Sequence, residues 1–248
     1  MPLLKDVSTK APKELEKEAA KDETKRIKKS LDELQNRLFA EGRHAVLVVI
    51  QGMDGSGKDG AIKNVFGGLN PQGIQVKSFK APSAEELSHD FLWRIHQHAP
   101  AKGMIQIFNR SHYEDVLITR VHGWCDDDTA QKRFKAINYF EELLQQHNNT
   151  TVLKFYLHVS PQEQQERLKE RTENSEKMWK YNATDFDEAK LWDKYMQVYE
   201  DVFAYCNNPE WTIVPADQNW YKEYFIAKTL ADKLEGLNLQ YPSLKEKE

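Results

Sequence analysis

A run of aliphatic residues that ends in a glycine-rich loop constrains the fold of this chain more than any other feature. Residues 45–51 are almost all aliphatic, which is typical of a central parallel strand buried on both faces. The segment GMDGSGK at residues 52–58 follows and matches GxxxxGK. Residues 59–69 then have the composition of a helix. A buried strand, this loop and a helix, in that order, predict a phosphate-binding loop.

Strands and helices alternate along the rest of the chain, so we predict an α/β fold. We expect a parallel five-stranded sheet with helices on both faces. Ser160 and Pro161 suit the N-cap and first position of one helix. The expected strands are residues 45–51, 75–80, 103–108, 151–158 and 211–214. The expected helices are residues 11–41, 59–69, 82–98, 128–148, the one from Ser160, and 219–236.

The first expected helix defines an N-terminal helical arm, residues 1–42. The apolar residues of this helix recur with 4-3-4 spacing, which places them on one face; they are Ile27, Leu31, Leu34 and Leu38. A helix this long must bury such a stripe somewhere. Two interpretations stay open, a solvated helix with one packed stripe and an arm that grips a neighbouring subunit. Residues 43–236 are expected to form one P-loop domain, and residues 237–248 a C-terminal tail.

Residues 167–208 lie between the fourth and last strands and are predicted to be helical, charged and aromatic, with no strand. Residues 173–183 are polar and are expected to form a loop over the sheet edge. A clear amphipathic helix follows, because apolar residues recur as 4-3-4-3 from Leu191 to Tyr205. This is where a helical lid would lie, although a plain surface hairpin is the simpler alternative.

Bulk composition excludes several classes of protein. The net charge of the 248 residues is −4, so no global basic field attracts nucleic acid or a membrane surface. A polyanionic substrate would need a local basic groove. Cys125 and Cys206 form no CxxC pair and are expected to be reduced thiols. With no apolar signal segment or membrane span in the sequence, we predict a cytoplasmic protein.

The residue types of the loop at residues 52–58 are suited to phosphate binding. Gly52, Gly55, Ser56 and Gly57 allow backbone N–H groups to turn inward around phosphate oxygens, and Lys58 can reach the phosphate being transferred.

Two carboxylates make this loop unusual. Asp54 lies inside it, and Asp59 occupies the position where Ser or Thr normally holds magnesium. Acids beside phosphates repel them unless cations intervene, so we predict that both serve Mg²⁺ binding, directly or through water. An acid in the first helical turn also favours the helix dipole, which gives Asp59 an alternative explanation.

A second polar segment, FNRSHYEDVL at residues 108–117, follows the third strand. Ligands in parallel sheets collect at that edge. Arg110 can fork onto phosphate oxygens, and Asp115, next to Glu114, could complete a metal site. Ordinary surface ion pairs are the alternative. His112 has two equal interpretations, packing and ligand contact.

Six segments together resemble the polyphosphate kinase 2 family, in the order that the family has them. The matches extend over about residues 25 to 235. They are RLFAEGR (37–43), GMDGSGKDG (52–60), FNRSHYED (108–115), EKMWK (176–180), LWDKY (191–195) and WTIVPAD (211–217).

The resemblance implies that residues 43–236 form a P-loop kinase fold related to thymidylate kinase, with a helical lid at about residues 167–208. It also implies Mg²⁺ dependence and a homotetramer. It implies phosphoryl transfer between inorganic polyphosphate and the adenine nucleotides AMP, ADP and ATP. Glu114 followed by Asp115 is similar to the subgroup that accepts AMP as well as ADP. Asp54 and Asp115 match the metal-linked positions of the family. The candidates for a cationic polyphosphate channel are Lys58, Lys80, Arg110, Arg120, Arg167 and Arg171.

These residues suggest a mechanism of positioning and charge stabilisation. Asp54 would hold the metal and orient the acceptor rather than remove a proton, and lid closure would exclude water. Contacts to the base stay open among Trp179, Tyr181 and residues 215–217. The alternatives are an ATP-dependent nucleoside or nucleotide kinase and a non-catalytic binding regulator. Asp59 argues against the former, and the intact set of acids and bases argues against the latter.

Overall fold

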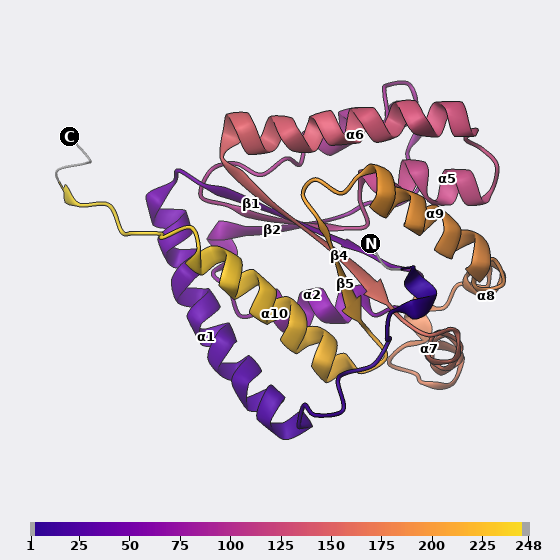
Figure 1. The fold of residues 1–248 in the computed structure, drawn as a ribbon, viewed down its shortest axis with the longest axis horizontal. Helices are drawn as coiled ribbons and strands as arrows, with labels where there is room; N and C mark the ends of the chain where they lie inside the picture. The colour runs from indigo at the N-terminus through magenta and orange to yellow at the C-terminus, as the bar shows by residue number, and fades with distance from the viewer. Residues whose placement is uncertain (1–2, 245–248) are drawn as a thin grey trace.

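The computed structural model describes residues 3–244 and contains one sheet of five parallel strands, in the order β2-β3-β1-β4-β5 (Figure 1). This confirms the predicted sheet. Every strand lies within two residues of its expected bounds. The strands are β1 (Ala45–Gln51), β2 (Ile74–Ser78), β3 (Ile105–Asn109), β4 (Thr150–His158) and β5 (Trp211–Pro215).

Strand β1 is the centre of the sheet. It pairs in parallel with β3 on one side and β4 on the other, and all seven of its residues are buried. An almost wholly aliphatic sequence is therefore required there, because both faces are covered. The strand order reverses at β1, and such a switch point opens a crevice at the carboxyl ends of the strands. The glycine-rich loop leaves β1 at that place and leads into α2 (Lys58–Phe66).

Helices cover both faces of the sheet, as predicted (Figure 1). One face carries α1, α2 and α10, and the other carries α6 and α9. The bounds of the α-helices other than α2 are α1 (Lys17–Glu41), α3 (Ala84–Leu87), α4 (Trp93–His96), α5 (Ile118–Val121), α6 (Asp127–Asn148), α7 (Pro161–Glu173), α8 (Thr184–Ala189), α9 (Trp192–Tyr205) and α10 (Asn219–Glu235). The short 3₁₀ helices are η1 (Leu4–Asp6), η2 (Pro71–Gly73), η3 (His112–Val116) and η4 (Met178–Lys180).

Two expected helices differ from the structure. The first begins at Lys17 rather than at residue 11, and it ends as predicted with Gly42 in the left-handed conformation. The helix expected over residues 82–98 is two short helices, α3 and α4. Local side chains interrupt it, because Ser88 Oγ donates to Glu85 O and the Asp90 carboxylate accepts from Leu92 N. Such bonds compete with continuous helix.

The apolar stripe of α1 packs inside the chain. Leu31, Leu34 and Leu38 are buried in the core that α1 shares with α10 and the sheet. The packed-stripe interpretation therefore accounts for this face, and the division into arm, domain and tail stays a prediction.

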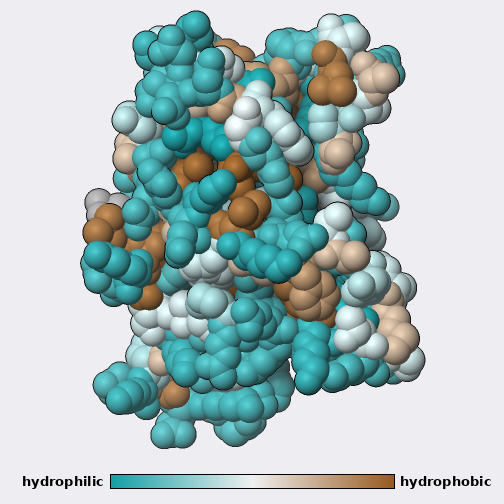
Figure 2. Space-filling model, turned by 90° about the vertical axis from the view of Figure 1, so that its right-hand side faces the viewer, coloured by the Kyte–Doolittle hydropathy of each residue, from teal (hydrophilic) through white to brown (hydrophobic). Residues whose placement is uncertain are grey.

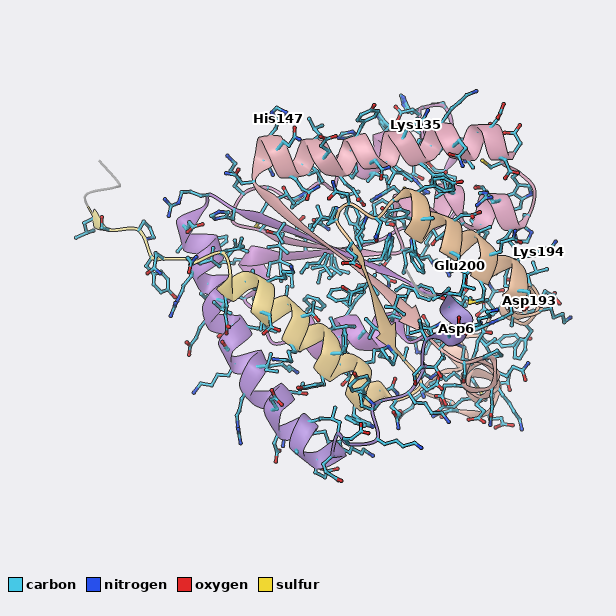
Figure 3. All side chains as sticks on the ribbon, in the orientation of Figure 1. Asp6, Lys135, His147, Asp193, Lys194 and Glu200 are labelled. Atoms are coloured by element: carbon cyan, nitrogen blue, oxygen red, sulfur yellow. The ribbon has the colours of Figure 1, made fainter. Side chains whose placement is uncertain are left out.

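The segment before α1 contacts two distant parts of the chain, α9 and the residues after β5. Leu4 N donates to Glu200 Oε1 on α9 at 2.8 Å, and Figure 3 shows Asp6 of η1 and Glu200 close together. Further along, Thr9 Oγ1 donates to the Asp217 carboxylate at 2.7 Å. The N-terminal segment therefore joins α9 to the end of β5.

Two expectations from composition can be compared with the structure. Cys125 and Cys206 are both buried free thiols. Burial raises the pKa of Cys206 to about 12, so this thiol stays protonated at neutral pH. Among residues 3–244, no helix combines the length and apolar character that a membrane span requires.

Candidate active site

A small cleft lies where the carboxyl ends of β1 and β3 approach α7, α8 and α9. It includes the loop after β1 and the turn after β3, and six residues that line it are Met53, Asp54, Arg110, Glu114, Gln164 and Tyr199. Figure 2 views the end of the molecule formed by α7, α8 and α9, where the surface is mostly hydrophilic. The predicted loop and the predicted polar segment thus meet in one place.

The loop has the geometry that its glycines predict. Gly55 and Gly57 have φ values of 84° and 89°, a region that glycine adopts without strain. Lys58 is buried, and its Nζ donates to Gly52 O at 2.6 Å and to Met53 O at 3.1 Å. Burial lowers the pKa of Lys58, while the carboxylate of Asp54, 3.8 Å away, opposes that shift. The ammonium therefore lies against the loop beside a carboxylate.

Arg110 lies between two acidic residues of the cleft, Asp54 and Glu114. Its guanidinium bonds Asp54 at 2.5 Å and lies 3.9 Å from Glu114. Its backbone has φ of 60°, an uncommon value for a residue other than glycine, and its N–H donates to Ile50 O. Strained backbone of this kind concentrates at functional sites.

Two carboxyls of the cleft, those of Asp54 and Glu114, have pKa values shifted in opposite directions. Burial raises the pKa of Asp54, but the charges of Lys58 and Arg110 outweigh burial and bring it below its ordinary value. Burial also raises the pKa of Glu114, and here Arg110 and Lys58 compensate only in part. Asp54 is therefore ionised at neutral pH, and Glu114 is the group that would gain most from another cation.

The donor set of the cleft fits a magnesium ion. Mg²⁺ prefers oxygen ligands and is usually held by one or two carboxylates together with substrate phosphates. Asp54 offers such an oxygen inside the cleft, with Glu114 beside it. No group of three or more His, Cys, Asp or Glu side chains that could hold a metal occurs in residues 3–244. Any such ion would depend on phosphate oxygens for most of its ligands.

Asp115 does not join this set, contrary to the prediction that it and Asp54 form the metal site together. Its carboxylate lies 3.4 Å from Arg94 Nη2, and its backbone oxygen accepts from Arg133 Nη1 at 2.6 Å. It does not line the cleft. In the 3₁₀ helix after Ser111, the side chains of the neighbouring Glu114 and Asp115 point in different directions, one to the cleft and one to Arg94. The sequence alone does not reveal this difference.

Asp59 connects the loop to the lid segment. Its carboxylate accepts from Asn109 Nδ2 at 2.9 Å and from Lys180 Nζ at 2.6 Å. Burial raises the pKa of Asp59, but the hydrogen bonds from Lys180 and Asn109 outweigh burial and lower it overall. Neither the metal nor the helix-dipole interpretation of Asp59 anticipated this contact.

The remaining predicted cations divide into one near the cleft and three elsewhere. Arg171 pairs with Asp185 and is close enough to lower the pKa of Asp54. Arg120 is held by Asp201 and Asp127 in a separate groove. Lys80 is exposed. Arg167 lies behind the loop and bonds its carbonyl oxygens, so the predicted contacts of Arg120 and Arg167 with phosphate are not supported.

His112 belongs to the interior. It is fully buried, and its Nε2 lies 3.2 Å from Glu141. The same carboxylate accepts from Tyr113 Oη at 2.8 Å and from Lys154 Nζ at 2.8 Å. The packing interpretation of His112 is therefore confirmed, and the ligand interpretation is wrong.

Comparison with known proteins places this architecture in a family. Residues 14–242 match the family described as Polyphosphate kinase 2 (PPK2). The chain belongs to this family. The resemblance seen in the sequence motifs is thereby confirmed, and the loop of residues 52–58 is the phosphate loop of a polyphosphate kinase 2 protein.

Two characterised relatives and one solved structure are similar to this polyphosphate kinase 2 chain over most of its length. An AMP/ADP-polyphosphate phosphotransferase of Meiothermus ruber is 46% identical, over 91% of this chain and 85% of the relative. An ADP-polyphosphate phosphotransferase of Rhodopseudomonas palustris is 42% identical, over 86% of this chain and 78% of the relative. The crystal structure of polyphosphate kinase 2 from Arthrobacter aurescens TC1 has a TM-score of 0.92 and 40% identity, over 97% of this chain and 87% of that one.

The segment predicted as the lid of this family member is helical, as expected. Residues 167–208 contain the end of α7, then η4, α8 and α9, and no strand. Trp179 is 77% exposed and Tyr181 51% exposed, so the packing interpretation of Trp179 is wrong. Residues 215–217 instead support the fold, since the Asp217 carboxylate accepts from Ser160 N at 2.7 Å.

Sequence reasoning missed several polar residues of the site. Gln164 and Glu188 line the cleft, and Lys222 lies behind the phosphate loop. One available signal was the 3-4 spacing of Gln164, Arg167 and Arg171, which places all three on one face of α7. No local pattern marks Lys222, because α10 reaches the loop only through the tertiary fold.

Proposed function

We propose that this protein is a polyphosphate-dependent nucleotide kinase. It transfers phosphoryl groups reversibly between inorganic polyphosphate and AMP or ADP, giving ADP and ATP. The observation that carries the proposal is one cleft that combines a phosphate loop with Asp54, Lys58 and Arg110. The names of the Meiothermus and Rhodopseudomonas relatives support the choice of substrates.

The reaction needs little proton chemistry from the protein. The second pKa of a phosphate monoester is about 6, so the attacking oxygen of the nucleotide is mostly deprotonated at neutral pH. Asp54 then orients the acceptor and holds the cation rather than acting as a strong base. Lys58 and Arg110 neutralise charge on the transferred phosphoryl group. Bound magnesium would supply further charge neutralisation, and Asp54 is the residue best placed to hold it.

The helical segment above the cleft would limit hydrolysis of polyphosphate. Lys180 reaches Asp59 at the start of α2, and Arg171 pairs with Asp185 between α7 and α8. The first ion pair connects the segment to the helix that follows the phosphate loop, and the second joins two helices within the segment. Closure over the bound substrates would exclude water from the transferring group.

Acceptance of AMP as well as ADP is the finer part of the proposal. It rests on the motif similarity around Glu114 and on the name of the Meiothermus relative, which includes both acceptors. Glu114 lines the cleft beside Arg110. By the same family resemblance we propose a cytoplasmic homotetramer without nucleic-acid or membrane partners, and size-exclusion chromatography with light scattering would test the tetramer.

Product analysis tests the activity. The purified protein is incubated with long-chain polyphosphate and Mg²⁺, with AMP and ADP offered separately and no ATP present. ATP formed from ADP, and lost in Asp54→Asn, would support the proposal. Formation of ADP from AMP would support the dual acceptor. No product from either acceptor, with transfer restored when ATP is the donor, would identify an ATP-dependent kinase instead.

A further inference from the structure

The carbonyl oxygens of the phosphate loop have partners of their own. When the N–H groups of a loop turn inward to bind an anion, the carbonyl oxygens face outward and require donors if they are buried. In this loop each carbonyl from residue 52 to residue 57 accepts a hydrogen bond from a side chain. The donors are Lys58 to Gly52 and Met53, Gln164 to Asp54, Arg167 to Gly55 and Ser56, and Lys222 to Gly57.

The guanidinium of Arg167 donates all its hydrogen bonds to protein atoms. Its Nη1 donates to Gly55 O at 3.1 Å and to Ser56 O at 3.0 Å. Its Nη2 donates to the backbone oxygens of residues 216 and 217 at 2.8 and 2.9 Å, and its Nε to Glu163 at 2.7 Å. A guanidinium has five N–H donors, and this one uses all of them on protein acceptors. No donor remains for a substrate phosphate.

Gln164 and Lys222 are also buried, and both donate to the loop. Gln164 Nε2 donates to Asp54 O at 2.8 Å, and Gln164 is almost wholly buried. Lys222 is 1% exposed, and its Nζ donates to Gly57 O at 3.2 Å and to Asn219 Oδ1 at 2.8 Å. The fit is close, because a Cβ atom on Gly57 would lie 2.3 Å from that Nζ.

We propose that Gln164, Arg167 and Lys222 are positioning residues that hold the loop in its anion-binding shape, Arg167 and Lys222 from behind the loop and Gln164 from the wall of the cleft. The inference rests on the proposed function of the loop as a phosphate site. Two elements distant in sequence, α7 and α10, thereby determine the directions of the loop N–H groups. Because α7 also carries Arg171 at the cleft, loop support and the start of the lid segment share one helix.

The first test compares two glutamines. Gln35 is also buried, and it bonds the backbone N and O of Asn70, away from the cleft. Gln164→Leu and Gln35→Leu each remove a buried side-chain bond to backbone. The dissociation constant of inorganic tripolyphosphate, measured by calorimetry, should rise about tenfold in Gln164→Leu, the effect of one lost donor to a buried acceptor. It should stay within about twofold of wild type in Gln35→Leu.

The thermal unfolding midpoint separates positioning from simple loss of stability. Gln35→Leu should lower it at least as much as Gln164→Leu, since Gln35 makes two hydrogen bonds to backbone and Gln164 makes one. Equal dissociation constants in the two variants, whatever their stability, would overturn the proposal. Because tripolyphosphate binding needs no turnover, this readout stays informative even if the polyphosphate reaction fails.

The second test uses the pH dependence of the same binding. Burial, reinforced by the nearby charge of Arg167, lowers the pKa of Lys222 to about 8, against the opposing charges of Glu223 and Glu163. The charged form favours anion binding, so its contribution is present below pH 8 and disappears as the pH rises through that value. Lys222→Met should lose this part of the profile and bind more weakly than wild type at every pH, because a neutral amine still donates to Gly57 O and a thioether cannot. Lys58 remains in both proteins, so the difference between their profiles reports Lys222. Identical profiles would overturn the role of Lys222.

Discussion

Two clusters of charged residues include residues of the short turn after β3, and they differ in exposure and in how far the charge of a carboxyl is compensated. The interior cluster consists of Lys154, Glu141, His112 and Tyr113, all buried, with contacts of 2.8–3.2 Å around one carboxylate. The cleft cluster contains Asp54, Lys58, Arg110 and Glu114. Its Arg110 and Asp54 side chains are 33% and 26% exposed.

The pKa shifts of Glu141 and Glu114 reflect this difference. Burial raises the pKa of Glu141, but the hydrogen bond from His112 and the charge of Lys154 outweigh burial, so the overall shift is downward. Burial raises the pKa of Glu114 and the nearby cations do not fully offset it. The interior carboxylate is satisfied by its protein partners, whereas a cleft carboxyl that is not fully compensated is suited to a ligand that brings a cation.

The largest expected effect is loss of turnover in Lys58→Met. Lys58 is the ammonium nearest the loop, and removing a charge that stabilises the transferred phosphoryl group should lower kcat by about 10³-fold or more. Steady-state rates of ATP formation from ADP measure this. The unfolding midpoint is recorded in parallel, because the substitution also removes the donor to Gly52 O and Met53 O. A variant that keeps a tenth of the wild-type rate would remove Lys58 from the mechanism.

A substitution in the interior cluster should instead reduce stability and leave the rate almost unchanged. Lys154→Met leaves Glu141 buried without its ion pair, which should reduce the free energy of unfolding by about 3 kcal/mol or more. Urea denaturation monitored by fluorescence measures this. The rate per folded molecule should stay within about threefold of wild type. Comparable losses of rate in Lys154→Met and Lys58→Met would erase the distinction between the two clusters.

A smaller effect should separate the two predicted metal carboxylates. Asp54 lines the cleft, whereas Asp115 pairs with Arg94. In Asp54→Asn the Mg²⁺ concentration required for half-maximal activity should increase about tenfold, because a carboxylate ligand is lost. In Asp115→Asn it should change by less than about threefold. Residual activity is followed at increasing Mg²⁺, and equal shifts would restore Asp115 to the metal site.

The smallest expected effect concerns the lid segment. Lys180→Ala removes the partly exposed ion pair with Asp59 and should raise the KM for polyphosphate by about two- to fivefold at low salt. Screening should shrink the difference from wild type as ionic strength increases. Lys190→Ala is a matched control, since Lys190 pairs only with Asp187 on an exposed face. An equal effect of both substitutions would show that the contact with Asp59 has no special role.

Much of the fold follows from local patterns in the sequence. The aliphatic run of β1, the glycine loop and the alternation of strands and helices are enough to predict a parallel five-stranded sheet. Burial on both faces and the backbone demands of the loop act on neighbouring residues, so a single sequence reveals them. The same patterns identified Asp54, Lys58 and Arg110, which the structure brings together in the cleft.

Only the tertiary structure decided which polar side chains face that cleft. Arg167 and Arg171 are one helical turn apart on α7, yet one supports the loop carbonyls and the other pairs beside the cleft. Glu114 and Asp115 are adjacent, yet only Glu114 lines the cleft. Lys222 reaches the loop across a sequence separation of 165 residues. Helical and strand periodicity determine the face on which a residue lies, whereas its partner depends on which distant elements the fold packs against that face.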